Sequence, residues 1–192
     1  NEFEAVQLIV RPRTALAELT AAADDLHGPG GATIPASEVR LLRVRYVKVT
    51  APSDSTGVAD EWPDPLPPFD KPITVPAGVN QPIWVLVRIP ETAAPGDYTG
   101  RIRLSARDFA ATVPIRLHVW DFALPRKPHT QAAFGMAIGN AYRYHGITRP
   151  EDQRALFAKY MQSFADHRVS PYDPTPFDPI RIRFRSDEGP PR

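Results

Sequence analysis

The sequence contains no cysteine, which excludes disulfide bonds, thiolate metal sites and a cysteine nucleophile. It also lacks a charge excess, because 23 lysines and arginines oppose 22 aspartates and glutamates. A nucleic-acid footprint or a polybasic membrane patch would need a basic surplus. No apolar run approaches the roughly 20 residues of a membrane helix. We therefore expect no nucleic-acid partner and no membrane insertion.

Several catalytic fingerprints are missing as well. None of the five histidines has a second ligand at metal-site spacing. Gly28, Gly30 and Gly31 do not precede a helix as a phosphate-binding loop does. No serine stands in a nucleophile elbow. The sequence accordingly predicts neither a metal site nor a cofactor.

Proline is abundant, at 23 of 192 residues against a usual share of about 5%. Ten of these prolines fall between Pro52 and Pro95. Proline has no N–H group and is confined to strand ends, sheet edges and loops. The first half therefore reads as short strands with long connections, and residues 50–72 as one long loop.

The clearest strand is Phe109–Trp120, in which apolar residues recur at every second position. Strict period two indicates one face in a core and one in water. Pro114 within this run predicts an edge strand or a bulge. Ile83–Ile89 and Tyr98–Leu104 repeat the pattern, so residues 82–120 are expected to form three consecutive antiparallel strands.

Three more strands are expected upstream. Val6, Leu8 and Val10 mark one at the start of the chain. Residues 14–26 fit a helix or a strand, and the regular strand spacing elsewhere favours a strand. Val39–Val49 changes its apolar parity near Tyr46, which predicts a bulge there. The chain is thus mainly β, with an antiparallel β-sandwich over residues 1–125.

The pattern changes after Pro125. Thr148–Glu151 reads as a capping box, and the apolar residues that follow recur at helical spacing: Leu156, Phe157, Tyr160, Met161 and Phe164. A buried strand is expected at Ala132–Ile138 before this helix and a short one at Arg168–Tyr172 after it. Strand, helix and strand form one βαβ unit of a parallel sheet, which cannot cover its own faces. Residues 126–192 are therefore expected to be an incomplete domain, with a further strand at Ile180–Phe184.

A series of short motifs then carries a family resemblance. In chain order they are Asn1-Glu2-Phe3-Glu4 with Gln7, Tyr46-Val47, Trp62-Pro63-Asp64-Pro65-Leu66-Pro67-Pro68, Val75-Pro76-Ala77-Gly78, Gln81-Pro82-Ile83-Trp84-Val85, Pro95-Gly96-Asp97-Tyr98-Thr99-Gly100 and Val119-Trp120-Asp121-Phe122-Ala123-Leu124-Pro125. Together they resemble the bacterial proteins carrying domain of unknown function 4091, grouped with glycoside hydrolase family 123. The likeness runs from Asn1 to about Pro128 and continues more weakly to Pro171.

This resemblance implies a fold and an activity. In that family an N-terminal β-sandwich precedes a catalytic (β/α)8 barrel, so residues 126–192 would be the first βα units of a truncated barrel. Characterised relatives are similar to retaining N-acetyl-β-galactosaminidases, which use an adjacent Asp-Glu pair and the acetamido group of the substrate. A whole barrel needs about 250 residues. We therefore expect the parent protein to hydrolyse an oligo- or polysaccharide, and this chain, without the catalytic carboxylates, to be inactive.

Location and termini follow only from the resemblance and the first residue. Related proteins are often exported, which implies a secreted or periplasmic location. The chain begins with Asn1 instead of Met, so we expect the natural start to lie upstream. The sugar, the linkage and the oligomeric state are not encoded in any pattern of this sequence.

Four residues are candidates for sugar contact because barrel sites form where strands end. Asn140 and Tyr142 follow the first expected barrel strand, and Tyr172 and Asp173 follow the second. The competing interpretation is that these are structural turn residues. Adjacent acidic residues occur at Asp24-Asp25, Asp60-Glu61 and Asp187-Glu188, and we interpret the last, which has the letters of a catalytic pair, as a polar loop.

Trp62 has two interpretations. An exposed indole in the proline-rich loop would stack on a sugar, whereas a buried one would pin the loop to its domain together with Leu66. Trp120 and Phe122 are expected to anchor the corner between the domains. A different class of function stays open beside the hydrolase: a non-catalytic carbohydrate-binding or structural β-sandwich module.

Overall fold

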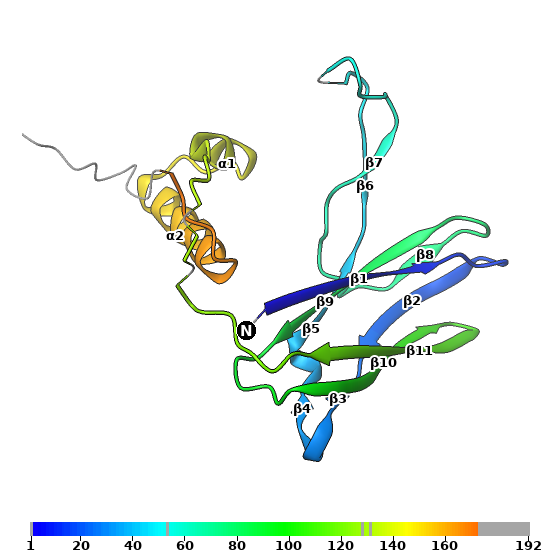
Figure 1. Ribbon diagram of the computed structural model, residues 1–192. Coiled ribbons are helices and arrows are strands. Elements are labelled where there is room, and N and C mark those ends of the chain that lie inside the picture. Colours follow the sequence, from blue (N-terminus) through cyan, green and yellow to red (C-terminus); the bar gives the residue numbers. More distant parts are fainter. Residues whose placement is uncertain (1, 53, 128, 131, 173–192) are drawn as a thin grey trace, which may run out of the picture. The chain divides into compact units, whose positions relative to one another are not determined.

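The computed structural model describes residues 2–52, 54–127, 129–130 and 132–172. The chain divides into two compact units, Asn1–Leu124 and Pro125–Arg192. The first unit is all β apart from two short 3-10 turns, and the second contains two helices (Figure 1). Each unit is described separately below.

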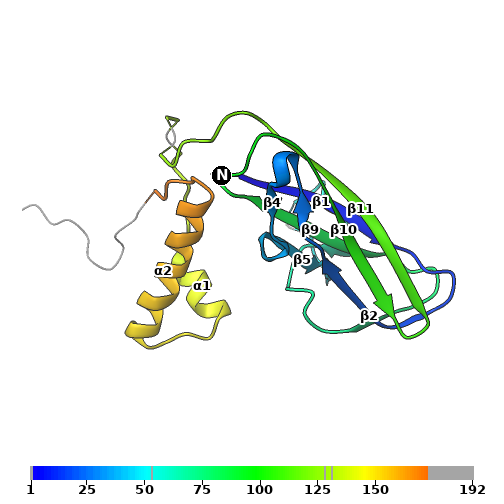
Figure 2. The same ribbon diagram turned by 90° about the horizontal axis from the view of Figure 1, so that it is seen from below.

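The first unit is built from two antiparallel sheets. The smaller sheet has the order β1 (Glu2–Val10), β9 (Gln81–Ile89), β5 (Val39–Arg43). The larger sheet runs β4 (Thr33–Ile34), β3 (Leu26–His27), β10 (Gly96–Ala106), β2 (Leu16–Ala23), β8 (Ile73–Val75), and β11 (Phe109–Val119) pairs with β10. Figure 2 shows the strands of both sheets from below. The expectation of a mainly β, antiparallel fold is confirmed.

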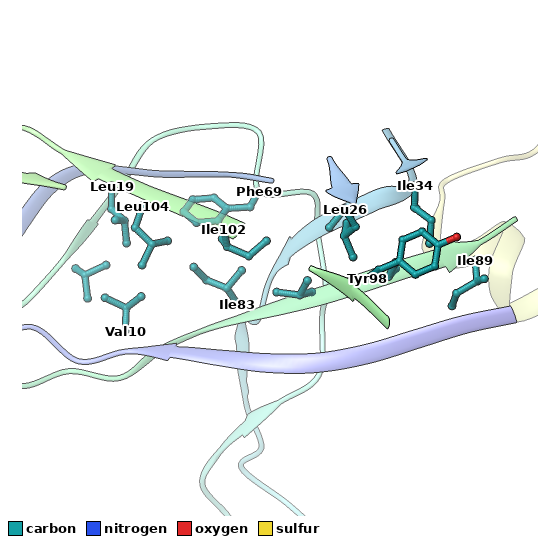
Figure 3. Close-up of a cluster of buried hydrophobic side chains, with 14 of the residues drawn as sticks. Val10, Leu19, Leu26, Ile34, Phe69, Ile83, Ile89, Tyr98, Ile102 and Leu104 are labelled. Atoms are coloured by element: carbon teal, nitrogen blue, oxygen red, sulfur yellow. The ribbon is translucent and has the colours of Figure 1, made fainter. Parts of the chain in front are cut away.

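The core lies between these sheets because alternate residues of each strand point inward. Ile83, Val85, Val87 and Ile89 of β9 are all buried, as the period-two pattern predicted. Tyr98, Ile102 and Leu104 of β10 face them from the other sheet (Figure 3). β11 alternates in the same way, and as an edge strand it accommodates Pro114.

The chain passes from the smaller to the larger sheet between β9 and β10, and Tyr98 holds this corner in place. Its ring is 1% exposed, and its hydroxyl donates to the carbonyl oxygen of Ala94 at 2.9 Å. Gly28 packs against this ring so closely that an added Cβ would lie 2.5 Å from a ring carbon. Gly96 has φ +128°, where other residues are strained. The segment Pro95–Gly100 is therefore explained by the fold and not by chemistry on a substrate.

Three sequence expectations for this unit are wrong. β9 and β10 do not pair, because the Tyr98 corner sends them to different sheets. The expected single strand over Val39–Val49 is two strands, β5 and β6 (Tyr46–Lys48), interrupted at Val44, which is buried. The expected loop over 50–72 contains β7 (Glu61–Pro63), which pairs with β6. In contrast, the ambiguous residues 14–26 do form strands, β2 and β3.

The β6–β7 hairpin extends beyond the two sheets of the first unit as a separate two-stranded ribbon (Figure 1). Val47 lies opposite Trp62 in its register, and Tyr46 lies opposite Pro63. The Asp54 carboxylate accepts hydrogen bonds from the amides of Thr56 and Gly57 and from the Thr56 hydroxyl in the connecting loop. These hydrogen bonds lower the pKa of Asp54 below its ordinary value, the Thr56 hydroxyl contributing most.

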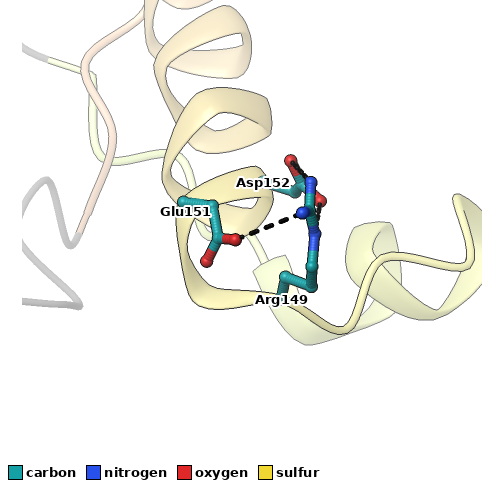
Figure 4. A network of polar contacts seen from close by, with 3 residues as sticks. All are labelled: Arg149, Glu151 and Asp152. Atoms are coloured by element: carbon teal, nitrogen blue, oxygen red, sulfur yellow. Dashed lines mark hydrogen bonds and ion pairs between the residues drawn. The ribbon is translucent and has the colours of Figure 1, made fainter.

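The second unit contains α1 (Ile138–Tyr144) and α2 (Pro150–Asp166). The amphipathic spacing correctly predicted α2. The capping box at Thr148 is wrong, because Arg149 is the N-cap and no side chain caps the helix. Instead, the Arg149 guanidinium donates to both carboxylate oxygens of Asp152 at 2.7 and 3.0 Å and lies 3.5 Å from Glu151 (Figure 4).

The expected buried strand Ala132–Ile138 is wrong as well. Within the described residues of that segment the structure has one parallel bridge, Phe134 to Pro171, and then α1. Phe134 N–H donates to Ser170 C=O, and Tyr172 N–H donates to Phe134 C=O, each at 2.9 Å. The expected strand at 168–172 is therefore reduced to this bridge. The expected strand at Ile180–Phe184 lies outside the described residues.

Candidate functional site

A groove of about 560 Å³ opens between the edge strands of the sandwich. β1 and β11 are both edge strands, so no further strand closes the two sheets on this side. The lining combines apolar and polar surface, and its apolar residues include Val6, Val87, Leu117 and Trp120. Ionisable side chains also contribute to it: Glu2, Glu4, Glu91, Arg116 and His118. The sandwich is thus open along one side.

Trp120 and Phe122 line this groove and are 67% and 68% exposed. The Trp120 ring contacts His118 edge to face, with centroids 4.6 Å apart, and the Nδ1 atom of His118 lies 2.6 Å from the Asp97 carboxylate. His118 lies on the solvent side of β11, as expected. Two large, exposed aromatic side chains beside a groove favour an interaction surface over a catalytic centre.

Trp62 lies on β7 and is 47% exposed. Its Nε1 donates to the carbonyl oxygen of Val58 at 2.8 Å, so the indole edge is held by its own hairpin. Leu66, which was expected to pack beside it, is 39% exposed. The ring therefore keeps a substantial surface in water within the first unit. Its role in sugar contact stays a prediction.

The acidic pairs inside the described residues serve local structure. Asp24 forms an ion pair with Arg103 at 2.7 Å, and Asp25 accepts a hydrogen bond from the Ala36 amide at 2.7 Å. Asp60 accepts one from the Glu61 amide at 2.8 Å. The third pair, Asp187-Glu188, lies outside the described residues. Among residues 2–172, except 53, 128 and 131, no cluster of histidine and acidic side chains forms a metal site.

The four candidates of the second unit lie on different local structures. Asn140 and Tyr142 are on α1, and the Asn140 side chain accepts a hydrogen bond from Arg143 at 3.4 Å. Burial raises the pKa of the Tyr142 hydroxyl, while the positive charge of Arg154 acts in the opposite direction. Tyr172 directly follows the parallel bridge and is 77% exposed. Asp173 lies outside the described residues.

Comparisons with known proteins add a family to this geometry. The family model described as "Glycoside hydrolase 123 N-terminal domain" matches residues 1–106, more than half of the chain. This chain belongs to that family. The matched span contains both faces of the sandwich core and the Tyr98 corner, and it ends at the last residue of β10.

A solved structure supports the same fold for this family 123 domain. The chain is similar to a family 123 glycoside hydrolase from Clostridium perfringens, studied for details of glycolipid glycan hydrolysis, with a TM-score of 0.77 and 15% sequence identity. The similarity covers 88% of this chain and 30% of that one. The chain thus spans less than a third of that enzyme's length. A comparison with curated proteins gave no match.

Sequence reasoning found the family motifs but missed the open side of the sandwich. The motif Gln81–Val85 is explained by packing: Gln81 is 8% exposed and donates to the carbonyl oxygens of Val44 and Pro82. The sequence held one signal for the groove: the apolar Trp120 and Phe122 directly follow a strand whose proline predicted an edge position. No helix in the described part of the chain is long and apolar enough to cross a membrane.

Proposed function

We propose that this chain is the N-terminal part of a glycoside hydrolase-like protein. Its β-sandwich, residues 1–125, supports a catalytic (β/α)8 barrel, and residues 126–192 are the first βα units of that barrel. The barrel hydrolyses glycosidic bonds, with an N-acetylhexosaminide as the substrate class that the family resemblance implies. The family match over residues 1–106 is the observation that carries this proposal.

Two features of the second unit support the barrel. Phe134 and Pro171 form a parallel bridge, and α1 and α2 lie between these two residues in the sequence. Parallel strand segments joined through helices are the connection of a βα unit. The similarity to the Clostridium perfringens enzyme covers 88% of this chain, which is more than the first unit, so it includes part of the second unit. A complete barrel takes about 250 residues, so most of it would follow this chain.

The proposal places the catalytic carboxyl groups beyond the described residues. Glycosidases need two carboxyl groups at the scissile bond, or one acid and a nucleophile supplied by the substrate. The described acidic pairs are engaged in turns and ion pairs of the sandwich and its hairpin. Asn140, Tyr142, Tyr172 and Asp173 would line the sugar site of the finished barrel. No cofactor is needed for this chemistry.

The test compares this chain with the longer polypeptide that the proposal requires. Both are assayed on aryl β-N-acetylgalactosaminides and on other aryl β-glycosides. We expect turnover by the longer protein and none by residues 1–192. A longer protein that folds but cleaves none of the glycosides would contradict the proposal. A version of it that lacks residues 1–125 and keeps full turnover and thermal stability would contradict the supporting role of the sandwich.

A non-catalytic carbohydrate-binding module is the second candidate, favoured by the exposed indole of Trp62. Affinity electrophoresis of the chain through gels that contain polysaccharides separates the two functions. Retardation that disappears in Trp62→Ala, but persists in Trp120→Ala, would support binding through the hairpin. Trp120→Ala is a matched control because it removes another exposed indole of the same unit. Unretarded migration in every gel would favour the supporting role.

A further inference from the structure

A second, smaller pocket lies where the β6–β7 hairpin leaves the sandwich. Its volume is about 330 Å³. β5, β6, β8, β9 and the segments joining them contribute its lining, and the polar residues among these are Arg43, Arg45, Tyr46, Thr74, Asn80 and Gln81. A pocket of this size is at the lower end of the range for small-molecule sites, which suits a single sugar residue.

The charge of this pocket is one-sided. Two arginines contribute to the lining and no aspartate or glutamate does. Neither Arg43 nor Arg45 forms an ion pair with an acidic side chain in the part of the chain that the structure describes. Asp64 is the acidic residue whose backbone amide pairs with Arg45, yet its carboxylate is outside the lining. In a chain of net charge +1, two guanidinium groups without carboxylates form a local positive site.

A buried amide positions one of these arginines. Gln81 is 8% exposed, and its Nε2 donates to the Val44 and Pro82 carbonyl oxygens at 3.1 and 2.7 Å. Its Oε1 accepts a hydrogen bond from Nε of Arg43 at 3.3 Å. This contact uses the Nε edge of the guanidinium and leaves both Nη groups available to an acceptor. A guanidinium held in this way is suited to a bidentate pair with a carboxylate.

We propose that this pocket binds a sugar that carries a carboxylate, as a uronic or a sialic acid does. The inference rests on the proposed function for the assignment to sugars, and on Arg43 and Arg45 for the carboxylate. The ring of Tyr46, 43% exposed, offers an apolar face to the sugar ring, and the Asn80 amide and Thr74 hydroxyl are partners for its hydroxyl groups. The site thus recognises an acidic residue of a glycan through residues of the first unit alone.

The experiment is an NMR titration of the 192-residue chain, labelled with ¹⁵N. The probes are D-glucuronic acid, N-acetylneuraminic acid, neutral N-acetylgalactosamine and inorganic sulfate. We expect one of the two acidic sugars to shift the amide signals of residues 43–46 and 79–81 saturably. Arg45→Gln should weaken its binding at least tenfold, since charge-assisted hydrogen bonds are lost. Arg101→Gln is the control, because Arg101 is an exposed arginine of β10 outside the pocket.

Four outcomes would overturn the inference. They are no saturable shift with either acidic sugar, equal affinity for the neutral sugar, equal affinity for sulfate, and unchanged affinity in Arg45→Gln. A thermal melt of each variant shows whether the fold is kept. Binding is measured directly on this chain, so its failure leaves the hydrolase proposal standing. Conversely, a longer protein without turnover would not alter a measured affinity for the acidic sugar.

Discussion

Ile83, Tyr98 and Ile102 of the first unit are almost completely enclosed, whereas Leu156, Phe157 and Phe164 of the second unit are only partly buried. Neither α1 nor α2 contains a buried residue. The sandwich encloses its core between two facing sheets, while in the described part of the second unit the strand pairing amounts to one bridge. The difference teaches that the first unit encloses its apolar core between sheets, whereas the apolar side chains of α1 and α2 stay partly exposed among the described residues.

The largest effect is expected from a pair of substitutions to alanine, one in each unit, that tests this contrast. Ile102→Ala removes side-chain volume from the sandwich core, and we expect a loss of about 2–5 kcal/mol in the free energy of unfolding. Leu156→Ala removes a partly exposed side chain of α2, and we expect about 1 kcal/mol or less. Urea unfolding is monitored by tryptophan fluorescence for Ile102→Ala, whose unit holds all three tryptophans, and by circular dichroism at 222 nm for Leu156→Ala in α2. Equal losses would mean that the two units are equally well packed.

A smaller effect is expected at the Tyr98 corner. Gly28→Ala places a Cβ 2.5 Å from the Tyr98 ring, so the ring or the backbone must move. Overpacking of this kind costs about 1–3 kcal/mol. Gly135→Ala is the matched control, since an added Cβ there meets no atom within 4 Å. The corner would be less tightly packed than described if both variants melted at the same temperature as the parent chain.

The smallest effect concerns pH and the first turn of α2. Hydrogen bonds from Arg149 lower the pKa of Asp152 below 3.8, so the ionised carboxylate is favoured in the folded helix. Its contribution is therefore complete above pH 3.8 and is lost as the pH falls through the lower, folded-state pKa. Circular dichroism at 222 nm should show this acid-dependent loss of helix in the parent chain.

Asp152→Asn and Arg149→Gln test the cause of that loss. Asp152→Asn removes the titrating group, and Arg149→Gln removes the charged donor that lowers its pKa. We expect the acid-dependent step to disappear in the first variant and to shrink in the second, because without Arg149 the folded-state pKa of Asp152 returns toward its unfolded value. An identical pH profile in all three proteins would show that the ion pair at Arg149 does not stabilise α2.

The strands of the sandwich were predictable because their signal is local. Period-two alternation in residues 83–89, 98–104 and 109–119 depends only on which side chains face the core. The assignment of strands to sheets was not predictable, since β9 and β10 are separated by a corner that depends on the hydroxyl of Tyr98 reaching Ala94. The interruption at Val44 was not predictable either, because it involves a hydrogen bond from the distant Gln81 to the Val44 carbonyl oxygen. The local pattern predicted a bulge instead.

The second unit and the binding surfaces were harder to predict. α1 contains Gly139 and Asn140, both poor helix formers, so its sequence gave no helical signal. α1 ends at Tyr144, and Gly146 shortly after it has a φ of +64°, which suits the turn that follows a helix C-terminus. The pocket lined by Arg43 and Arg45 brings together residues that are far apart in sequence. No local sequence pattern indicates that such residues lie close together. The family motifs, in contrast, were recognisable because they lie in contiguous stretches.

The most direct test of the proposed division into a well-packed sandwich and the start of a barrel is amide hydrogen exchange, measured on this chain and on a longer protein that carries the proposed barrel. We expect strong protection of β9 and β10 in both proteins, because their hydrogen bonds lie over the buried core. We expect α2 to exchange rapidly in residues 1–192 and to gain protection of at least a hundredfold in the longer protein. Equal protection of α2 in both would contradict the account.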